Sequence, residues 1–256
     1  MIVCQDLTRK FGEFVSVNSV NLSVKQGELF GFLGLNGAGK TTTIKMMTGL
    51  LSPTSGSVSL GGFDVVRQPL DAKQIFGYVP DAPFLYDKLS GREYLDFMAD
   101  LYRMPGSGRE ARIDSLLTLF DLSNKGNELI QGYSRGMRQK IALAGAIIHD
   151  PKIIFLDEPT VGLDPRSART MEGILTELCR RGMTVLISTH VLDVAQRMCN
   201  RIAILHRGTI AAQGSMEELR AFGQTAGTPD HPRSLEEIFF SLTGEAGTTD
   251  IERLLL

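Results

Sequence analysis

The spacing of hydrophobic residues changes several times along this chain, and each spacing predicts a different element. Between residues 2 and 24 apolar and polar positions alternate, which predicts antiparallel strands with one buried face around a turn at 10–13. Short apolar runs predict further strands at 29–33, 57–60, 76–79, 153–156, 185–187, 202–205 and 209–212. The runs at 153–156 and 185–187 are apolar throughout, as in parallel strands that are buried on both faces.

Helices are predicted in most of the intervals between these strands. Ser90-Gly91-Arg92-Glu93 is a capping box, in which the serine and the glutamate each bond a free backbone N–H group, and it opens a helix that runs to about Met104. Asp164-Pro165 marks another helix start, because proline suits a first helical turn. The other predicted helices are 41–50, 109–120, 134–148, 215–222 and 234–242.

This order of elements predicts an α/β fold with a mostly parallel sheet, helices on both of its faces and an antiparallel β part at the N-terminus. We expect one main domain over 1–222. Its sheet-based core comprises 1–80 and 150–214, and a helical subdomain at 81–149 is inserted between these two parts. Residues 223–256 form a C-terminal loop and helical extension, to which the sequence assigns no function.

Residues 34–41 read Gly-Leu-Asn-Gly-Ala-Gly-Lys-Thr and fit the phosphate-binding pattern G-x-x-x-x-G-K-[ST] between a predicted strand and a predicted helix. Glycines let a backbone approach a ligand closely, and N–H groups at a helix start attract anions. Lys40 adds a positive charge for the outer phosphates, and the Thr41 hydroxyl can ligate Mg²⁺. The sequence therefore predicts a nucleoside triphosphate held by Gly34, Leu35, Asn36, Gly37, Ala38, Gly39, Lys40, Thr41 and Thr42.

Two other apolar strands also end in polar residues, Asp157-Glu158-Pro159 and Ser188-Thr189-His190. In an open parallel sheet ligands bind outside the carboxyl ends of the strands, so we expect these residues beside the phosphate loop. Asp157 would hold Mg²⁺ together with Thr41. Glu158 would orient or deprotonate an attacking water, and His190 would bond the γ-phosphate or support Glu158.

Composition fits this prediction and narrows the partners. The chain has 256 residues, is 43% hydrophobic and 22% charged, and carries a net charge of −2, so no basic excess indicates a nucleic-acid partner. No apolar run is long enough for a membrane span, and the first residues lack the pattern of a secretory signal. Three cysteines without a C-x-x-C pair fit a reducing cytoplasm, where we expect the protein.

These motifs together resemble those of the ATP-binding subunits of ABC transporters, in the family's order and over residues 1 to about 215. GLNGAGKTT resembles the Walker A motif, IIFLDEPT the Walker B motif, residues 161–165 the D-loop and ISTH the His switch. The resemblance implies a P-loop NTPase fold that hydrolyses ATP with Mg²⁺. It also implies that Phe11 stacks on adenine and that Asp164 of the D-loop belongs to the nucleotide site.

Two segments depart from the family's usual pattern. The signature motif, most often Leu-Ser-Gly-Gly-Gln, is replaced by the five residues 133–137, and this variant resembles exporters of the ABC-2 type. The residues expected at the phosphates of a second subunit are Ser134, Arg135, Gly136 and Met137. At the Q-loop, where the family usually has Gln, this chain has Asp81. A carboxylate can still ligate Mg²⁺ but cannot donate a hydrogen bond to the attacking water.

The resemblance implies a head-to-tail homodimer that closes on two ATP molecules. It also implies that the dimer drives the separate integral-membrane permease of an exporter, on the cytoplasmic face of the membrane. Residues 81–86 would form part of the surface that receives the permease. An ABC-type ATPase that regulates without transporting remains an open alternative. A soluble ABC ATPase acting on ribosomes or DNA fits less well, because the chain has neither a second such domain nor a long coiled coil. A GTPase is rejected because 124–127, Asn-Lys-Gly-Asn, lacks the aspartate of the guanine motif.

Overall fold

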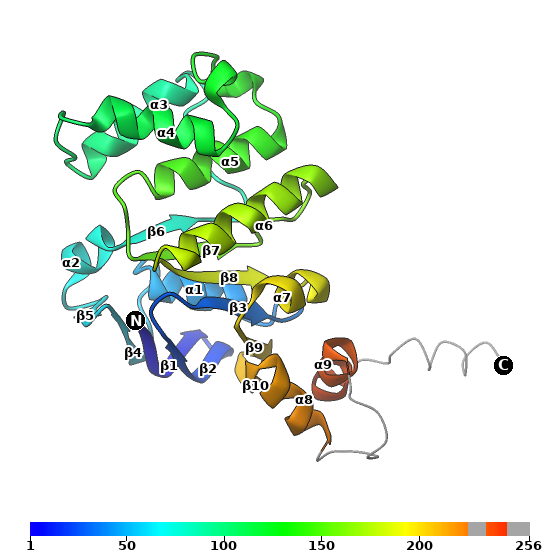
Figure 1. The fold of residues 1–256 in the computed structure, drawn as a ribbon. Coiled ribbons are helices and arrows are strands. Elements are labelled where there is room, and N and C mark those ends of the chain that lie inside the picture. Colours follow the sequence, from blue (N-terminus) through cyan, green and yellow to red (C-terminus); the bar gives the residue numbers. More distant parts are fainter. Residues whose placement is uncertain (225–233, 245–256) are drawn as a thin grey trace.

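The computed structural model describes residues 1–224 and 234–244 and contains two sheets (Figure 1). The first is antiparallel, in the order β2-β1-β4-β5, and is formed by β1 (Ile2–Phe11), β2 (Phe14–Val24), β4 (Ser55–Leu60) and β5 (Phe63–Asp64). The second has the order β10-β9-β3-β8-β7-β6. Its strands are β3 (Leu29–Leu33), β6 (Phe76–Val79), β7 (Ile153–Asp157), β8 (Thr184–Thr189), β9 (Arg201–His206) and β10 (Thr209–Ser215). Every pair in it is parallel except β9 with β10.

The larger sheet is covered on both faces, which confirms the predicted fold class. Successive residues of a strand point to opposite faces, and on β3 Phe30 and Phe32 belong to one hydrophobic core while Leu29 and Leu33 belong to the other. The first core includes apolar residues of β1, β2, β4 and α1 (Lys40–Met47). The second is built largely with helices, including α5 (Arg135–Ala146), α6 (Pro165–Arg180) and α7 (Leu192–Met198).

Most predicted helices form, with ends set by local backbone geometry. The capping box at Ser90 and Glu93 opens α3 (Gly91–Leu101) as predicted, but the helix ends earlier because Arg103 takes a positive φ of 54°. Helix α1 likewise ends before residue 50, with Gly49 at φ 69°. The sequence interpretation missed β5, α2 (Pro69–Gln74) and α7, which are too short to show a period.

Helices α3, α4 (Arg109–Leu119) and α5 lie together at one end of the molecule (Figure 1), around buried residues such as Leu95, Ile113 and Ile141. The arrangement supports the helical insertion expected at 81–149, although the domain bounds stay a proposal. No helix in the described parts of the chain combines the length and hydropathy that crossing a bilayer requires.

The C-terminal helices are α8 (Met216–Gln224) and α9 (Leu235–Thr243), and both form close to their predicted bounds. Leu235, Ile238 and Phe239 of α9 are buried, and α9 contacts α7, α8 and β9 of its own chain. The apolar face of this helix is therefore covered within the same domain. Residues 225–233 and 245–256 of the predicted loop and extension lie outside the described residues.

His149, just after α5, joins the helical end of the molecule to the sheet. Its ring stacks on Tyr102 at 3.5 Å between centroids and 5° between planes, and its Nε2 lies 3.2 Å from the Phe76 carbonyl oxygen. The Nδ1 atom is buried and has no hydrogen-bond partner in the part of the chain that the structure describes. A second proton would have to sit on this atom, so burial lowers the pKa of His149 from 6.5 to about 4.

This shift predicts a pH-dependent stability. The unfolded histidine binds a proton below about pH 6.5 while the native one stays neutral until about pH 4, so the contribution is full above pH 6.5 and is lost as the pH falls through this window. Because the ring is only partly buried, we expect wild type to lose about 1 kcal/mol more than His149→Gln between pH 7 and pH 5. Urea unfolding at both pH values measures the difference. Equal losses in the two proteins would contradict the assignment.

Candidate functional site

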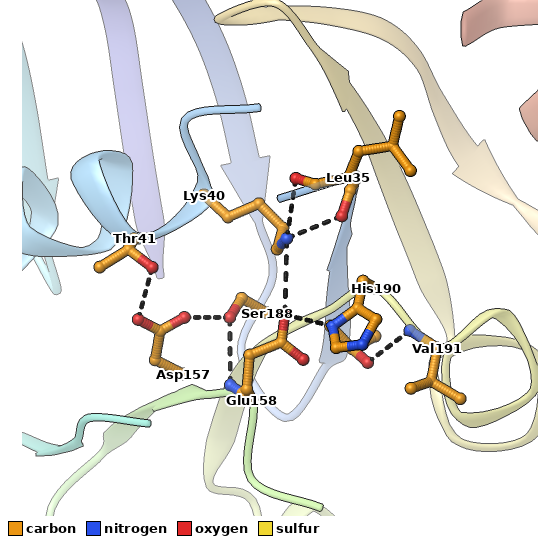
Figure 2. Close-up of polar contacts among 10 residues, drawn as sticks. Leu35, Lys40, Thr41, Asp157, Glu158, Ser188, His190 and Val191 are labelled. Atoms are coloured by element: carbon orange, nitrogen blue, oxygen red, sulfur yellow. Dashed lines mark hydrogen bonds and ion pairs between the residues drawn. The ribbon is translucent and has the colours of Figure 1, made fainter. Parts of the chain in front are cut away.

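The three strand ends that the sequence singled out lie side by side in the larger sheet. Strand β8 lies between β3 and β7, with Leu33 opposite Thr189 and Asp157 opposite Ser188. The phosphate loop, which follows β3, therefore faces the residues that follow β7 and β8 across one edge of the sheet. Figure 2 shows that Lys40, Thr41, Asp157, Glu158 and His190 come together at this edge.

The phosphate loop takes a shape that its glycines permit. A Cβ at Gly34 would lie 2.6 Å from the Leu205 carbonyl oxygen, so no larger residue fits there without a shift of the backbone. Gly39 has φ 104° and is the N-cap of α1, and no side chain caps this helix start. The first N–H groups of a helix have no intrahelical acceptor and attract anions. The loop is therefore suited to hold phosphate.

Lys40 is 6% exposed, and its ammonium group is held by the loop itself. Its Nζ donates to the carbonyl oxygens of Gly34 at 2.7 Å and Leu35 at 3.1 Å, and it lies 3.4 Å from Glu158 Oε1. A buried cation requires such partners, because an unpaired charge is costly to desolvate. The lysine thus holds its charge at the loop and can exchange these partners for phosphate oxygens.

Asp157 is buried and accepts two hydrogen bonds, one on each oxygen. Thr41 Oγ1 donates to Oδ2 at 2.7 Å, and Ser188 Oγ donates to Oδ1 in a short contact. Mg²⁺ in proteins takes one or two carboxylate or hydroxyl oxygens and otherwise uses water and substrate phosphates. The described residues contain no group of three or more His, Cys, Asp or Glu side chains that could form a complete metal cage. The pair of Thr41 and Asp157 therefore fits a magnesium ion shared with a phosphate.

Glu158 has a strained backbone and one oxygen without a partner. Its φ is 50°, and its backbone N–H lies 3.1 Å from the Ser188 carbonyl oxygen and 3.2 Å from Ser188 Oγ. Its Oε1 lies 3.0 Å from His190 Nδ1 and also contacts Lys40 Nζ, whereas Oε2 is buried and has no hydrogen-bond partner among the described residues. Backbone strain and unsatisfied polar atoms cluster at active sites.

The structure does not bring every predicted residue to this cluster. Asp81 is exposed and follows β6. It lies close enough to Tyr78 to affect the pKa of that residue. Burial first, and then the charges of Asp157 and Asp81, raise the pKa of Tyr78 to about 12. Asp164 caps α6 by accepting from the N–H groups of Arg166 and Ser167, and hydrogen bonds from these residues hold its pKa below the usual value. No hydrogen bond or ion pair among the described residues joins either carboxylate to the phosphate loop.

The signature segment forms the start of α5. Ser134 caps the helix, with Met137 N–H donating to its Oγ at 3.3 Å, and no acidic residue stands in the first turn. A Cβ at Gly136 would lie 3.2 Å from Ser167 Oγ, and one at Gly162 would meet the Arg135 guanidinium. The signature and D-loop segments therefore touch within one chain. Neither is hydrogen-bonded to the phosphate loop of the same chain in the part that the structure describes.

Ser188 has a role that the sequence interpretation missed. Its Oγ donates a hydrogen bond to Asp157 and accepts one from the Glu158 N–H, and the residue is fully buried. Ser188 therefore holds both acidic residues in position. Its position in the sequence could have revealed this role. Ser188 is the first polar residue after the apolar run 185–187, and such a residue lies at the carboxyl end of its strand, beside the end of the neighbouring parallel strand.

Comparison with known proteins gives the family. The family model described as ABC transporter matches residues 17–161, more than half of the chain. This chain belongs to the ABC transporter family. The motif resemblance found in the sequence is thereby confirmed.

Two curated ABC transporter ATP-binding proteins illustrate the relationship. The ATP-binding protein NatA of Bacillus subtilis is 38% identical over 224 residues, which cover 86% of this chain and 91% of NatA. The probable multidrug ATP-binding protein YbhF of Escherichia coli is 37% identical over 242 residues, 94% of this chain. This chain spans only 41% of the length of YbhF.

Solved ABC structures share the fold. An ATP-binding subunit of an ABC transporter superposes with a TM-score of 0.86 at 32% identity, covering 94% of this chain and 99% of that one. A dimeric ATP-binding cassette in a post-hydrolysis state, bound to ADP and Pi, has a TM-score of 0.76 at 27% identity, covering 84% and 98%. The predicted P-loop NTPase fold of this ABC protein is confirmed.

Proposed function

We propose that this chain is the ATP-binding and ATP-hydrolysing subunit of an ABC exporter, which drives a separate membrane-spanning permease. The observation that carries the proposal is the buried Oε2 of Glu158, which has no hydrogen-bond partner among the described residues and lies beside the phosphate loop. The start of α1, which follows this loop, has no side-chain cap among those residues either. A general base needs an oxygen that is available to a water proton, and a buried acceptor without a partner costs about 1–3 kcal/mol unless a ligand satisfies it. Family membership supports the same conclusion.

Each residue of the site would have a separate role in ATP hydrolysis. Lys40 leaves the Gly34 and Leu35 carbonyls to hold the outer phosphates, while the N–H groups at the start of α1 receive the inner ones. Glu158 takes the proton of the attacking water at Oε2, and His190 holds its other oxygen, which fixes the carboxylate. Thr41 and Asp157 would hold Mg²⁺, which when bound supplies positive charge against the charge that develops on the phosphate oxygens. Asp81 as a further metal ligand remains part of the proposal.

Two copies of the chain would complete each site head to tail. The residues Ser134, Arg135, Gly136 and Met137 lie at a helix start without acidic side chains, so they suit the γ-phosphate of an ATP held by the other copy's Lys40. Asp164 would join the same interface, because its neighbours Gly162 and Leu163 lie against the signature segment. The dimeric structure of the related cassette that binds ADP and Pi supports this arrangement. ATP would favour closure because it binds the closed state more tightly.

The permease would dock in an apolar groove of about 450 Å³ between α2, the end of α3 and β6. Its lining includes Leu50, Leu70 and Leu101, which are large apolar residues exposed to solvent. An adjoining cavity includes Pro83 and Phe84 from the expected docking segment 81–86, and Phe84 is largely exposed. Such a contiguous apolar surface marks an interaction site. In this arrangement the chain lies on the cytoplasmic face of the membrane, held there by the permease.

Replacing Leu70 tests this docking surface. Leu70 is 75% exposed, and Leu70→Glu would put a charge into the proposed contact, so we expect recovery of the tagged chain with membranes to fall at least about tenfold. The affinity for ATP should stay within twofold. Val3→Glu, which changes an exposed apolar residue of β1 outside the groove, is the matched control. If pull-down from cells yields no membrane protein with wild type, the non-transport role is favoured instead.

A further inference from the structure

The Arg9 side chain contacts Phe11, the residue that the family resemblance implies stacks on adenine. The Arg9 guanidinium lies over the Phe11 ring, 4.6 Å from its centroid, at the end of β1. Such a contact contributes about 0.5–1 kcal/mol at an exposed site. Phe11 nevertheless remains 47% exposed, although apolar rings are normally buried. One part of the ring is therefore held by arginine while the rest is open.

Arg9 is itself fixed to the chain that follows α1. Its Nη1 donates to the Ser52 carbonyl oxygen at 2.7 Å, and its Nε is buried and has no hydrogen-bond partner within residues 1–224 and 234–244. Next to it the Lys10 N–H donates to Thr54 Oγ1 at 3.0 Å, and the Thr54 N–H donates to the Thr8 carbonyl oxygen at 2.8 Å. These bonds attach the end of β1 to the 52–54 turn, so the guanidinium is held in place and is not a free surface arginine.

The same hairpin lies beside the phosphate loop. After the turn, β2 brings Ser16 against the start of α1, where its Oγ donates to Thr42 Oγ1 at 3.2 Å. The Ser16 carbonyl oxygen lies 2.7 Å from the place of a Cβ on Gly39. Phe11 is paired with Phe14 only a few residues before this contact. A nucleotide whose phosphates sit at the start of α1 would therefore have its base near this hairpin.

We propose that Arg9 is a positioning residue for the nucleotide base: it fixes the Phe11 ring so that its open part forms a flat platform for a purine. The inference rests on the proposed ATP binding. An unheld exposed ring must lose its rotamer freedom when a base stacks on it, and each immobilised side chain lowers affinity by roughly two- to tenfold. Arg9 would remove that loss before the ligand arrives.

The test compares a ligand with a base and one without. With Mg²⁺ present, Arg9→Ala should raise the Kd for ATP by roughly two- to tenfold and change the Kd for inorganic tripolyphosphate less than twofold. Arg9→Gln retains a donor for the Ser52 carbonyl without the cation, and we expect the same selective loss. In Phe11→Ala, adding Arg9→Ala should change ATP affinity by less than twofold, because the ring that Arg9 holds is already gone.

The alternatives give different results. If Arg9 acts only through its charge or through stability of the fold, both ligands weaken by the same factor, and the inference is wrong. Unchanged ATP affinity in both Arg9 variants also overturns it, while the proposed function stands. If wild type binds tripolyphosphate but gains nothing from the base, the platform does not exist. If wild type binds neither ligand, it is the proposed function that fails.

Discussion

Glu158→Gln is expected to bind ATP within about threefold of the wild-type affinity and to hydrolyse it roughly 10²- to 10⁴-fold more slowly. The amide keeps the size of the side chain and an oxygen for Lys40, which lies 3.4 Å from Oε1 in wild type. Glutamine tolerates the φ of 50° no better or worse than glutamate, so the backbone strain is unchanged. What the variant loses is the basic oxygen at the position of Oε2.

Phosphate release and nucleotide binding, measured on the same preparation, separate these two effects. Because hydrolysis would end the closed state, size-exclusion chromatography should show an ATP-dependent dimer for Glu158→Gln that wild type does not accumulate. Glu217→Gln changes an exposed carboxylate in the first turn of α8 and should retain wild-type turnover. Turnover of Glu158→Gln above half of the wild-type rate would disprove the role of Glu158 as base.

Lys40→Ala should weaken ATP binding by roughly a hundredfold, or about 3 kcal/mol. The variant removes the only full positive charge of the phosphate loop. In wild type the Lys40 ammonium group donates to the Gly34 and Leu35 carbonyl oxygens and pairs with Glu158. It also leaves Glu158, 12% exposed, without this cation, and the carboxylate would then repel the phosphates.

Titration calorimetry with ATP and Mg²⁺ measures this loss. Lys45→Ala is the matched control, because Lys45 belongs to the same helix but is exposed in its last turn, and we expect its ATP affinity to stay within twofold of wild type. An ATP affinity of Lys40→Ala within threefold of wild type would mean that the loop does not hold the triphosphate.

The sequence predicted where the residues of the candidate site lie, because they follow apolar strands. Once 29–33, 153–156 and 185–187 are interpreted as parallel strands, their carboxyl ends must share an edge, and Asp157, Glu158 and His190 lie there as expected. The strand order itself, with β8 between β3 and β7, was not predicted, since parallel strands are joined through distant crossovers. Helix α7 was missed because seven residues that bury only Val194 and Ala195 show no period.

Contacts between side chains were the least predictable part. Ser188 stood in a strand-end motif, but its bonds to Asp157 and Glu158 depend on register, which the sequence does not state. Arg9 gave no signal, because its partners Phe11 and Ser52 are brought to it by the β hairpin and by the turn after α1. Phe11, Ser134 and Asp81 entered through family resemblance alone, and their roles remain proposals.

The positive φ of Glu158 has a consequence for how such a chain can change over time. A non-glycine residue in this conformation costs on the order of 1–3 kcal/mol, and glycine or asparagine would relieve part of it. Selection for folding alone would therefore replace this glutamate, while selection for turnover retains it. A gene copy freed from the proposed transport role would be expected to drift at position 158 first, gaining stability as it loses activity.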